Sequence, residues 1–122
     1  LDCAPAPLQL VPEFRRAVGD RLKLIIDSGG RRGSDIVKAL AVGADMVMSG
    51  RPTLYGSAAA GEAGAYRALE IFQTEMDRIM AQLGLNSVDE ISPHIFWNPP
   101  EWVPKPKTAR VLEEITSRAF GG

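Results

Sequence analysis

Two short apolar runs, each followed by glycine and arginine, constrain the fold of this chain more than any other feature. The runs are residues 22–26 and 44–49, and each has the length and composition of a buried strand that gives way to a loop. The loop residues are Asp27, Ser28, Gly29, Gly30 and Arg31 after the first run and Gly50 and Arg51 after the second. We therefore expect two strands whose carboxyl ends carry similar loops.

The composition of these loops is typical of a phosphate site. Glycine lets the backbone approach a ligand and adopt positive φ, so that neighbouring N–H groups converge on an anion. Arginine adds a charged planar fork, and a helix starting at Ser34 as N-cap would direct its free N–H groups to the same place. In (β/α)8 barrels a phosphate often lies between the last two strands. The two loops together are thus predicted to bind a phosphate.

Helices are expected on either side of each strand. Apolar residues recur at helical spacing up to Gly19, and residues 34–43 form a helix between the strands. A short helical turn at 52–60 precedes the longest helix, whose apolar stripe ends at Leu83 before Gly84. This α-β-α-β-α order is typical of a parallel sheet. Two strands leave open edges, which favours a fragment of a larger sheet over a small independent domain.

Composition and charge exclude several classes of function. The chain is 45% hydrophobic and 24% charged, as in a soluble globular protein, and its net charge of −1 gives no general attraction for nucleic acid. No apolar stretch is long enough to cross a bilayer. The single cysteine, Cys3, predicts a reducing compartment and a buried or partly buried thiol. The chain opens at Leu1 without Met or a signal peptide, which we interpret as the interior of a longer sequence.

The end of the chain differs from the rest, so we divide it into residues 1–91 and a tail, residues 92–122. The tail contains five of the nine prolines and both tryptophans, and a final amphipathic helix is expected at 108–120. Because a disordered tail seldom carries two tryptophans, we expect it to pack against the protein or a neighbouring subunit.

Residues 1–91 resemble the carboxyl-terminal part of the FMN-dependent α-hydroxy acid oxidases and dehydrogenases, the family of glycolate oxidase, lactate oxidase and (S)-mandelate dehydrogenase. The motifs that carry the resemblance are the segments 27–44, 49–52 and 61–64. It implies an α/β fold in which this chain forms strands seven and eight of a (β/α)8 TIM barrel with their flanking helices. It also implies that the enzyme oxidises an (S)-2-hydroxy acid, mandelate- or lactate-like, to the 2-oxo acid.

The resemblance assigns FMN to the two loops. The family's D-[GS]-G-x-R and G-R elements fall on Asp27, Ser28, Gly29, Gly30, Arg31, Gly50 and Arg51. The resemblance implies that the aspartate accepts hydrogen bonds from the ribityl chain, while the glycine amides and both arginines surround the phosphate. Gly30 stands where a hydrophobic residue is common in the family, and we expect it to loosen the turn.

The family's catalytic histidine and arginine are absent from this chain. The resemblance places them before Leu1, so we assign no catalytic residue and no metal ligand here and expect the N-terminal part of the same enzyme as a partner. His94 lies away from the strand ends and is expected to be structural or exposed. Asp35 and Asp45 are expected to be capping or surface carboxylates, and Arg32 faces either the site or solvent.

Other functions stay open at this point. The chain could be the phosphate-binding barrel fragment of another FMN or nucleotide enzyme, such as IMP dehydrogenase or type 2 isopentenyl diphosphate isomerase, or a non-catalytic remnant. The triplet Gly50, Arg51, Pro52 favours the hydroxy acid family. The resemblance further implies a tetramer or octamer. It implies a cytoplasmic enzyme, with peripheral attachment to the inner face of the membrane left open.

Overall fold

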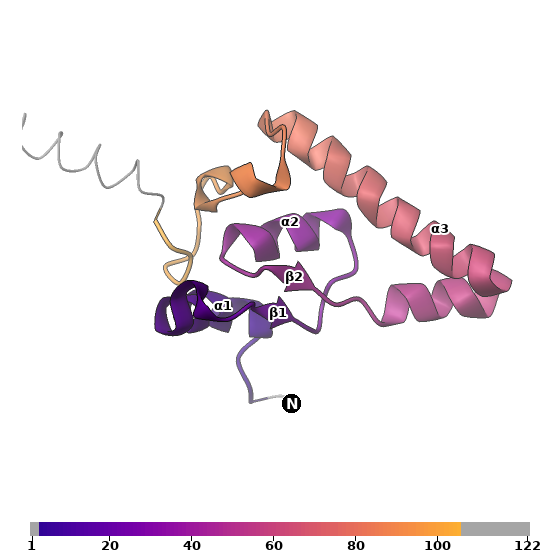
Figure 1. Ribbon diagram of the computed structural model, residues 1–122, viewed down its shortest axis with the longest axis horizontal. Coiled ribbons are helices and arrows are strands. Elements are labelled where there is room, and N and C mark those ends of the chain that lie inside the picture. Colours follow the sequence, from indigo (N-terminus) through magenta and orange to yellow (C-terminus); the bar gives the residue numbers. More distant parts are fainter. Residues whose placement is uncertain (1–2, 106–122) are drawn as a thin grey trace, which may run out of the picture.

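The computed structural model describes residues 3–105, which form helices around a two-stranded sheet (Figure 1). The elements are α1 (Pro7–Val18), β1 (Ile25–Ile26), α2 (Gly33–Ala41), β2 (Met46–Val47) and α3 (Arg51–Leu83), with 3-10 turns at Gly19–Arg21, Val88–Glu90 and Pro93–Ile95. The strands are parallel, with Ile25 opposite Met46 and Ile26 opposite Val47. The predicted α-β-α-β-α order is confirmed, whereas the helix expected at 108–120 lies outside the described residues.

Helix α2 lies at the centre of the packing, between the strands and α3 (Figure 1). One of its faces joins a cluster of buried residues from α1, β1 and the segment after α3, namely Val11, Ile26, Ala39, Val42, Ala44 and Val103. Its other face packs on α3 and on the segment after it, in a cluster of Val37, Ala41, Met80 and Ile91. Small side chains on α2 let the backbones approach closely, so both clusters form around one short helix.

The strands are shorter and more exposed than the sequence predicts. Ile26 is buried, but Ile25, Met46 and Met48 expose 55%, 59% and 55% of their surface. Side chains alternate between the two faces of a strand, so one face of this sheet is covered and the other is open. The expectation of fully buried strands is wrong, because no element within residues 3–105 covers the second face.

Helix α3 consists of two helical segments separated by a kink. Ala60 (φ −152°) and Gly61 (φ +60°) are not helical, so the expected short turn before the longest helix is confirmed. The segments touch at two glycines, since a Cβ built on Gly64 would lie 1.9 Å from the carbonyl oxygen of Gly56. The second segment ends, as predicted, at Gly84 in the left-handed conformation. No helix within residues 3–105 has the length and apolar character that crossing a membrane requires.

A charged cluster joins α1 to the amino ends of both strands. The Asp45 carboxylate accepts hydrogen bonds from the Leu24 N–H (2.8 Å), from Lys23 Nζ (3.1 Å) and from the Arg15 guanidinium. Arg15 Nε also donates to the Gly43 carbonyl at 2.8 Å. The Leu24 N–H, followed by Arg15 and Lys23, lowers the pKa of Asp45 to about 2. Asp45 is thus a partly buried carboxylate that joins α1 to the strands, rather than the capping or surface carboxylate that was expected.

The single cysteine and the single histidine both lie on the surface. Cys3 is exposed, so the expectation of a buried or partly buried thiol is wrong. The reason is its place ahead of α1, outside both buried clusters. His94 is exposed in the turn Pro93–Ile95, where Nδ1 lies 2.5 Å from Ser92 Oγ, and its expected structural or surface role is confirmed.

Candidate functional site

The loops after β1 and β2 lie side by side and enclose a cavity of about 180 Å³. It is lined by Met48 and by all seven residues that the sequence singled out, Asp27, Ser28, Gly29, Gly30, Arg31, Gly50 and Arg51. The loops are joined directly, because Ser49 Oγ donates a hydrogen bond to the Gly30 carbonyl at 3.1 Å. Parallel strands place their carboxyl ends at the same edge of the sheet, which brings the loops together. Nothing in the sequence marked Met48 as a residue of the site except its position directly before Ser49.

The loop after β1 turns sharply through two left-handed residues. Ser28 has φ +80° and Gly29 has φ +93°, and the Ser28 N–H donates to Asp27 Oδ1 at 2.7 Å. Serine adopts this conformation at a higher cost than glycine does. A Cβ on Gly30 would lie 2.9 Å from Val47 Cγ1 and 3.3 Å from the Met48 carbonyl oxygen. Gly30, which was expected to loosen the turn, thus lets the loop lie directly against β2.

The amino end of α2 does not offer its N–H groups to the cavity, so this part of the prediction is wrong. The helix begins at Gly33 with Arg32 as N-cap, rather than at Ser34. Two carboxylates accept three N–H groups around the helix start: Asp35 Oδ2 accepts those of Arg31 (3.1 Å) and Arg32 (3.0 Å), which precede the helix, and Glu75 Oε2 accepts that of Gly33 (2.7 Å). Asp35 is thus a capping carboxylate, as expected. Sequence reasoning missed Glu75, which lies 42 residues from Gly33.

Other backbone donors around the cavity are free. Within residues 3–105, no acceptor is found for the N–H groups of Gly29, Gly30, Gly50 and Arg51. A Cβ built on Gly29 or Gly50 would meet no atom within 4 Å, so the wall there is open backbone. The guanidinium groups of Arg31 and Arg51 form no ion pair in the described part of the chain. The free N–H groups, the start of α3 at Arg51 and the two arginines together fit a dianionic phosphate.

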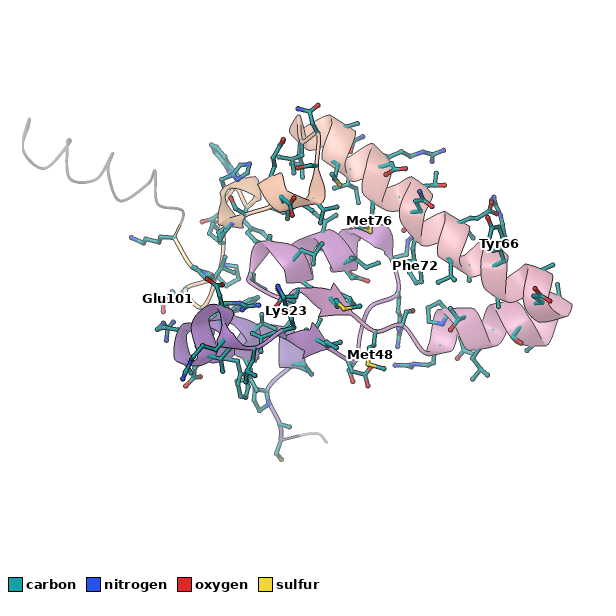
Figure 2. All side chains as sticks on the ribbon, in the orientation of Figure 1. Lys23, Met48, Tyr66, Phe72, Met76 and Glu101 are labelled. Atoms are coloured by element: carbon teal, nitrogen blue, oxygen red, sulfur yellow. The ribbon has the colours of Figure 1, made fainter. Side chains whose placement is uncertain are left out.

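A larger apolar cavity of about 800 Å³ adjoins this site and shares both arginines. Its other walls are the two segments of α3, including Tyr55, Ala63 and Phe72. Phe72 and Met76 lie on the side of α3 that faces α2 (Figure 2). The arginines therefore lie where a polar and an apolar cavity meet.

The fold and this site define an α/β chain with a phosphate-type site between two neighbouring parallel strands. The sequence matches the family described as FMN-dependent dehydrogenase over residues 1–98. Because this match covers more than half of the chain, the chain belongs to the FMN-dependent dehydrogenase family, as predicted. The alternatives in other nucleotide-binding families are thereby set aside.

Individual relatives and solved structures agree with this family. (S)-Mandelate dehydrogenase from Pseudomonas putida is 45% identical over 98 residues, which are 80% of this chain and 24% of that protein. Pre-mycofactocin synthase from Mycobacterium tuberculosis is also 45% identical, over 93 residues, which are 76% of this chain and 24% of that protein. A structure of an oxidized active mutant of (S)-mandelate dehydrogenase matches 81% of this chain and 28% of that one, at 44% identity and a TM-score of 0.76. The chain spans about a quarter of the length of these curated relatives.

Proposed function

We propose that this chain is the FMN-binding part of an enzyme that oxidises an (S)-2-hydroxy acid, mandelate- or lactate-like, to the 2-oxo acid. The observation that carries the proposal is the single cavity lined by all seven predicted residues, in a chain of the FMN-dependent dehydrogenase family. The similarity to (S)-mandelate dehydrogenase favours a hydroxy acid as substrate. Pre-mycofactocin synthase shows the same 45% identity to this chain, so identity alone does not separate the two substrate classes and a direct test is needed.

Different residues of the cavity would contact different parts of FMN. Arg31 and Arg51 neutralise the phosphate, and the free N–H groups of Gly29, Gly30 and Gly50 donate to its oxygens. Asp27 fixes the loop through the Ser28 N–H and has lone pairs left for a ribityl hydroxyl. When bound, FMN supplies the acceptor for the two electrons that leave the hydroxy acid.

The two strands of this chain have a proposed place in a larger barrel. We propose that β1 and β2 are strands seven and eight of a (β/α)8 barrel, with residues 1–91 in the barrel and 92–122 as its tail. The open sheet face supports this arrangement, because parallel strands are normally covered on both faces. The partner would be the N-terminal part of the same enzyme, which carries the catalytic histidine and arginine.

The assembly and location of the enzyme are also proposed from the family. We propose that the enzyme is a homo-oligomer, a tetramer or octamer. We also propose that it is cytoplasmic, and peripheral attachment to the inner face of the membrane is the alternative location to test. No nucleic acid partner is proposed, because the net charge of the chain is −1. Light scattering and sedimentation with vesicles of inner-membrane lipid test these two points.

Absorbance spectroscopy of the purified enzyme that contains this chain tests the function. We expect flavin bands that bleach when (S)-mandelate or (S)-lactate is added without oxygen, and that stay unchanged with the (R)-enantiomers. An enzyme without flavin would contradict the cofactor assignment. An enzyme with FMN that neither acid reduces would contradict the substrate class and leave the cofactor assignment standing.

A further inference from the structure

Glu75 connects α3 to the loop after β1 and to the start of α2 through two hydrogen bonds and an ion pair. Glu75 Oε2 accepts from the Gly33 N–H at 2.7 Å and from Arg32 Nε at 3.2 Å, and Oε1 lies 2.8 Å from Arg32 Nη2. The Glu75 side chain is 20% exposed, against 71% for Arg32. The backbones are also in contact here, because a Cβ on Gly33 would lie 2.5 Å from Glu75 Cβ and 2.6 Å from the Met76 nitrogen.

These contacts separate two adjacent arginines that could otherwise compete for the same anion. Arg31 lines the cavity of about 180 Å³, whereas Arg32 does not. The N–H groups of both residues are held by Asp35, so the backbone of the pair is fixed. Glu75 then holds the Arg32 guanidinium on the α3 side of the loop. The arrangement leaves one arginine of this loop for the cavity.

Glu75 also occupies the donor at the start of α2. The first N–H groups of a helix attract anions, and the Gly33 N–H is the first of this helix. With its carboxylate on that N–H, Glu75 occupies the first donor of α2, so that this donor is not open to an anion. The Arg32 guanidinium balances the carboxylate charge, so the pair adds little net repulsion toward a phosphate.

We propose that Glu75 is a positioning residue for the phosphate site, which presents Arg31 to the cavity by holding Arg32 and the Gly33 N–H on its far side. The inference rests on the proposed function, since it takes the phosphate of FMN as the anion that the cavity binds. A purely structural role, in which Glu75 only clamps α2 to α3, makes a different prediction about ligands that lack the phosphate.

Flavin titrations of the complete apoenzyme separate the two roles. FMN and riboflavin differ by the phosphate alone, so the ratio of their Kd values measures the phosphate contribution. We expect Glu75→Gln to weaken FMN binding about tenfold, as for the loss of one charged hydrogen bond, and to change riboflavin binding less than twofold. Glu70→Gln is the matched control, because Glu70 is on the same helix and, among residues 3–105, its carboxylate pairs only with the exposed Arg67 guanidinium, at 3.2 Å.

Arg32→Gln provides a second variant that leaves the contact between Gly33 and Glu75 in place. Because it removes the guanidinium that Glu75 holds away from the cavity, it should change the preference for FMN over riboflavin less than twofold, and the double variant should recover part of the preference that Glu75→Gln loses. Rescue of the preference by Glu75→Asp would support the same role. An equal loss of FMN and riboflavin in Glu75→Gln, or no loss of either, would overturn the inference. A wild-type enzyme that binds both flavins equally would overturn the proposed function as well.

Discussion

The two loops of the candidate site are held in place in opposite ways. In the loop after β1, carboxylates of Asp27, Asp35 and Glu75 accept the N–H groups of Ser28, Arg31, Arg32 and Gly33. In the loop after β2, a hydroxyl group donates to carbonyl oxygens instead. Thr53 Oγ1 lies 3.3 Å from the carbonyl oxygen of Ser49 and 2.9 Å from that of Gly50. The first loop thus has most of its donors occupied, and the second has its acceptors occupied.

Two loops of similar sequence thus supply different parts of one anion site. The loop after β1 offers a fixed backbone, the N–H groups of Gly29 and Gly30, and the side chain of Arg31. The loop after β2 runs directly into α3, so Gly50 and Arg51 offer free N–H groups where the helix dipole favours an anion. The loops are complementary, and each should be needed.

Removal of either arginine is expected to give the largest effect. Arg31→Gln and Arg51→Gln should each weaken FMN binding about 10- to 100-fold, because a hydrogen bond to a charged group contributes about 1.5–3 kcal/mol. Riboflavin binding should change little. Flavin fluorescence titration of the apoenzyme measures both affinities. An effect confined to one arginine would show that a single loop binds the phosphate, which would contradict the complementary roles of the two loops.

Gly33→Ala tests whether the first loop depends on its contact with α3. The new Cβ would overlap the backbone of Glu75 and Met76, which cannot move without shifting the helix. We expect a loss of about 1–3 kcal/mol in the free energy of unfolding, typical of overpacking, together with weaker FMN binding. Urea unfolding monitored by circular dichroism measures the stability. An unchanged midpoint would contradict the close packing of α2 on α3.

Acid should loosen the opposite ends of the strands through Asp45. Its pKa in the folded chain is about 2, below the ordinary value of 3.8, so the unfolded chain binds more protons between these pH values. The stability that Asp45 contributes is complete above about pH 4 to 5 and is lost as the pH falls toward 2. Asp45→Asn should lower the stability at pH 7 and flatten the profile between pH 4 and 2. A variant profile as steep as that of the wild type would show that another group controls acid unfolding.

Ser34→Ala should give the smallest effect. A serine N-cap typically contributes about 1 kcal/mol, but α2 is capped at Arg32 and its first donors are held by Asp35 and Glu75. We expect a change below about 0.5 kcal/mol, as for an ordinary surface substitution. Thermal unfolding of Ser34→Ala, Gly33→Ala and the wild type under the same conditions compares the losses of stability. A loss near 1 kcal/mol would restore Ser34 as the cap.

Local patterns in the sequence predicted most of the fold. Gly84 ends the longest helix in the left-handed conformation, and the kink at Gly61 separates the two expected segments, because such stops depend on the residues themselves. The seven residues around the cavity were also predictable, since the carboxyl ends of parallel strands share one edge.

Features that depend on distant residues were not predictable in this way. The open faces of Ile25 and Met46 depend on what covers the sheet, and an apolar run looks the same with or without a cover. The role of Glu75 requires the crossing of α3 over α2, which brings it beside Gly33 from 42 residues away. Ser34 has the residue type of an N-cap, but the neighbouring Asp35 and the distant Glu75 hold the donors there instead.

A crystal structure of the complete enzyme with FMN would show directly whether both loops hold the phosphate. We expect the phosphate in the cavity between the two loops, with oxygens within hydrogen-bond distance of the Gly50 N–H and of the Arg31 and Arg51 guanidinium groups, and with Arg32 still paired to Glu75. A phosphate bound at the amino end of α2, or FMN held by residues outside both loops, would contradict this expectation.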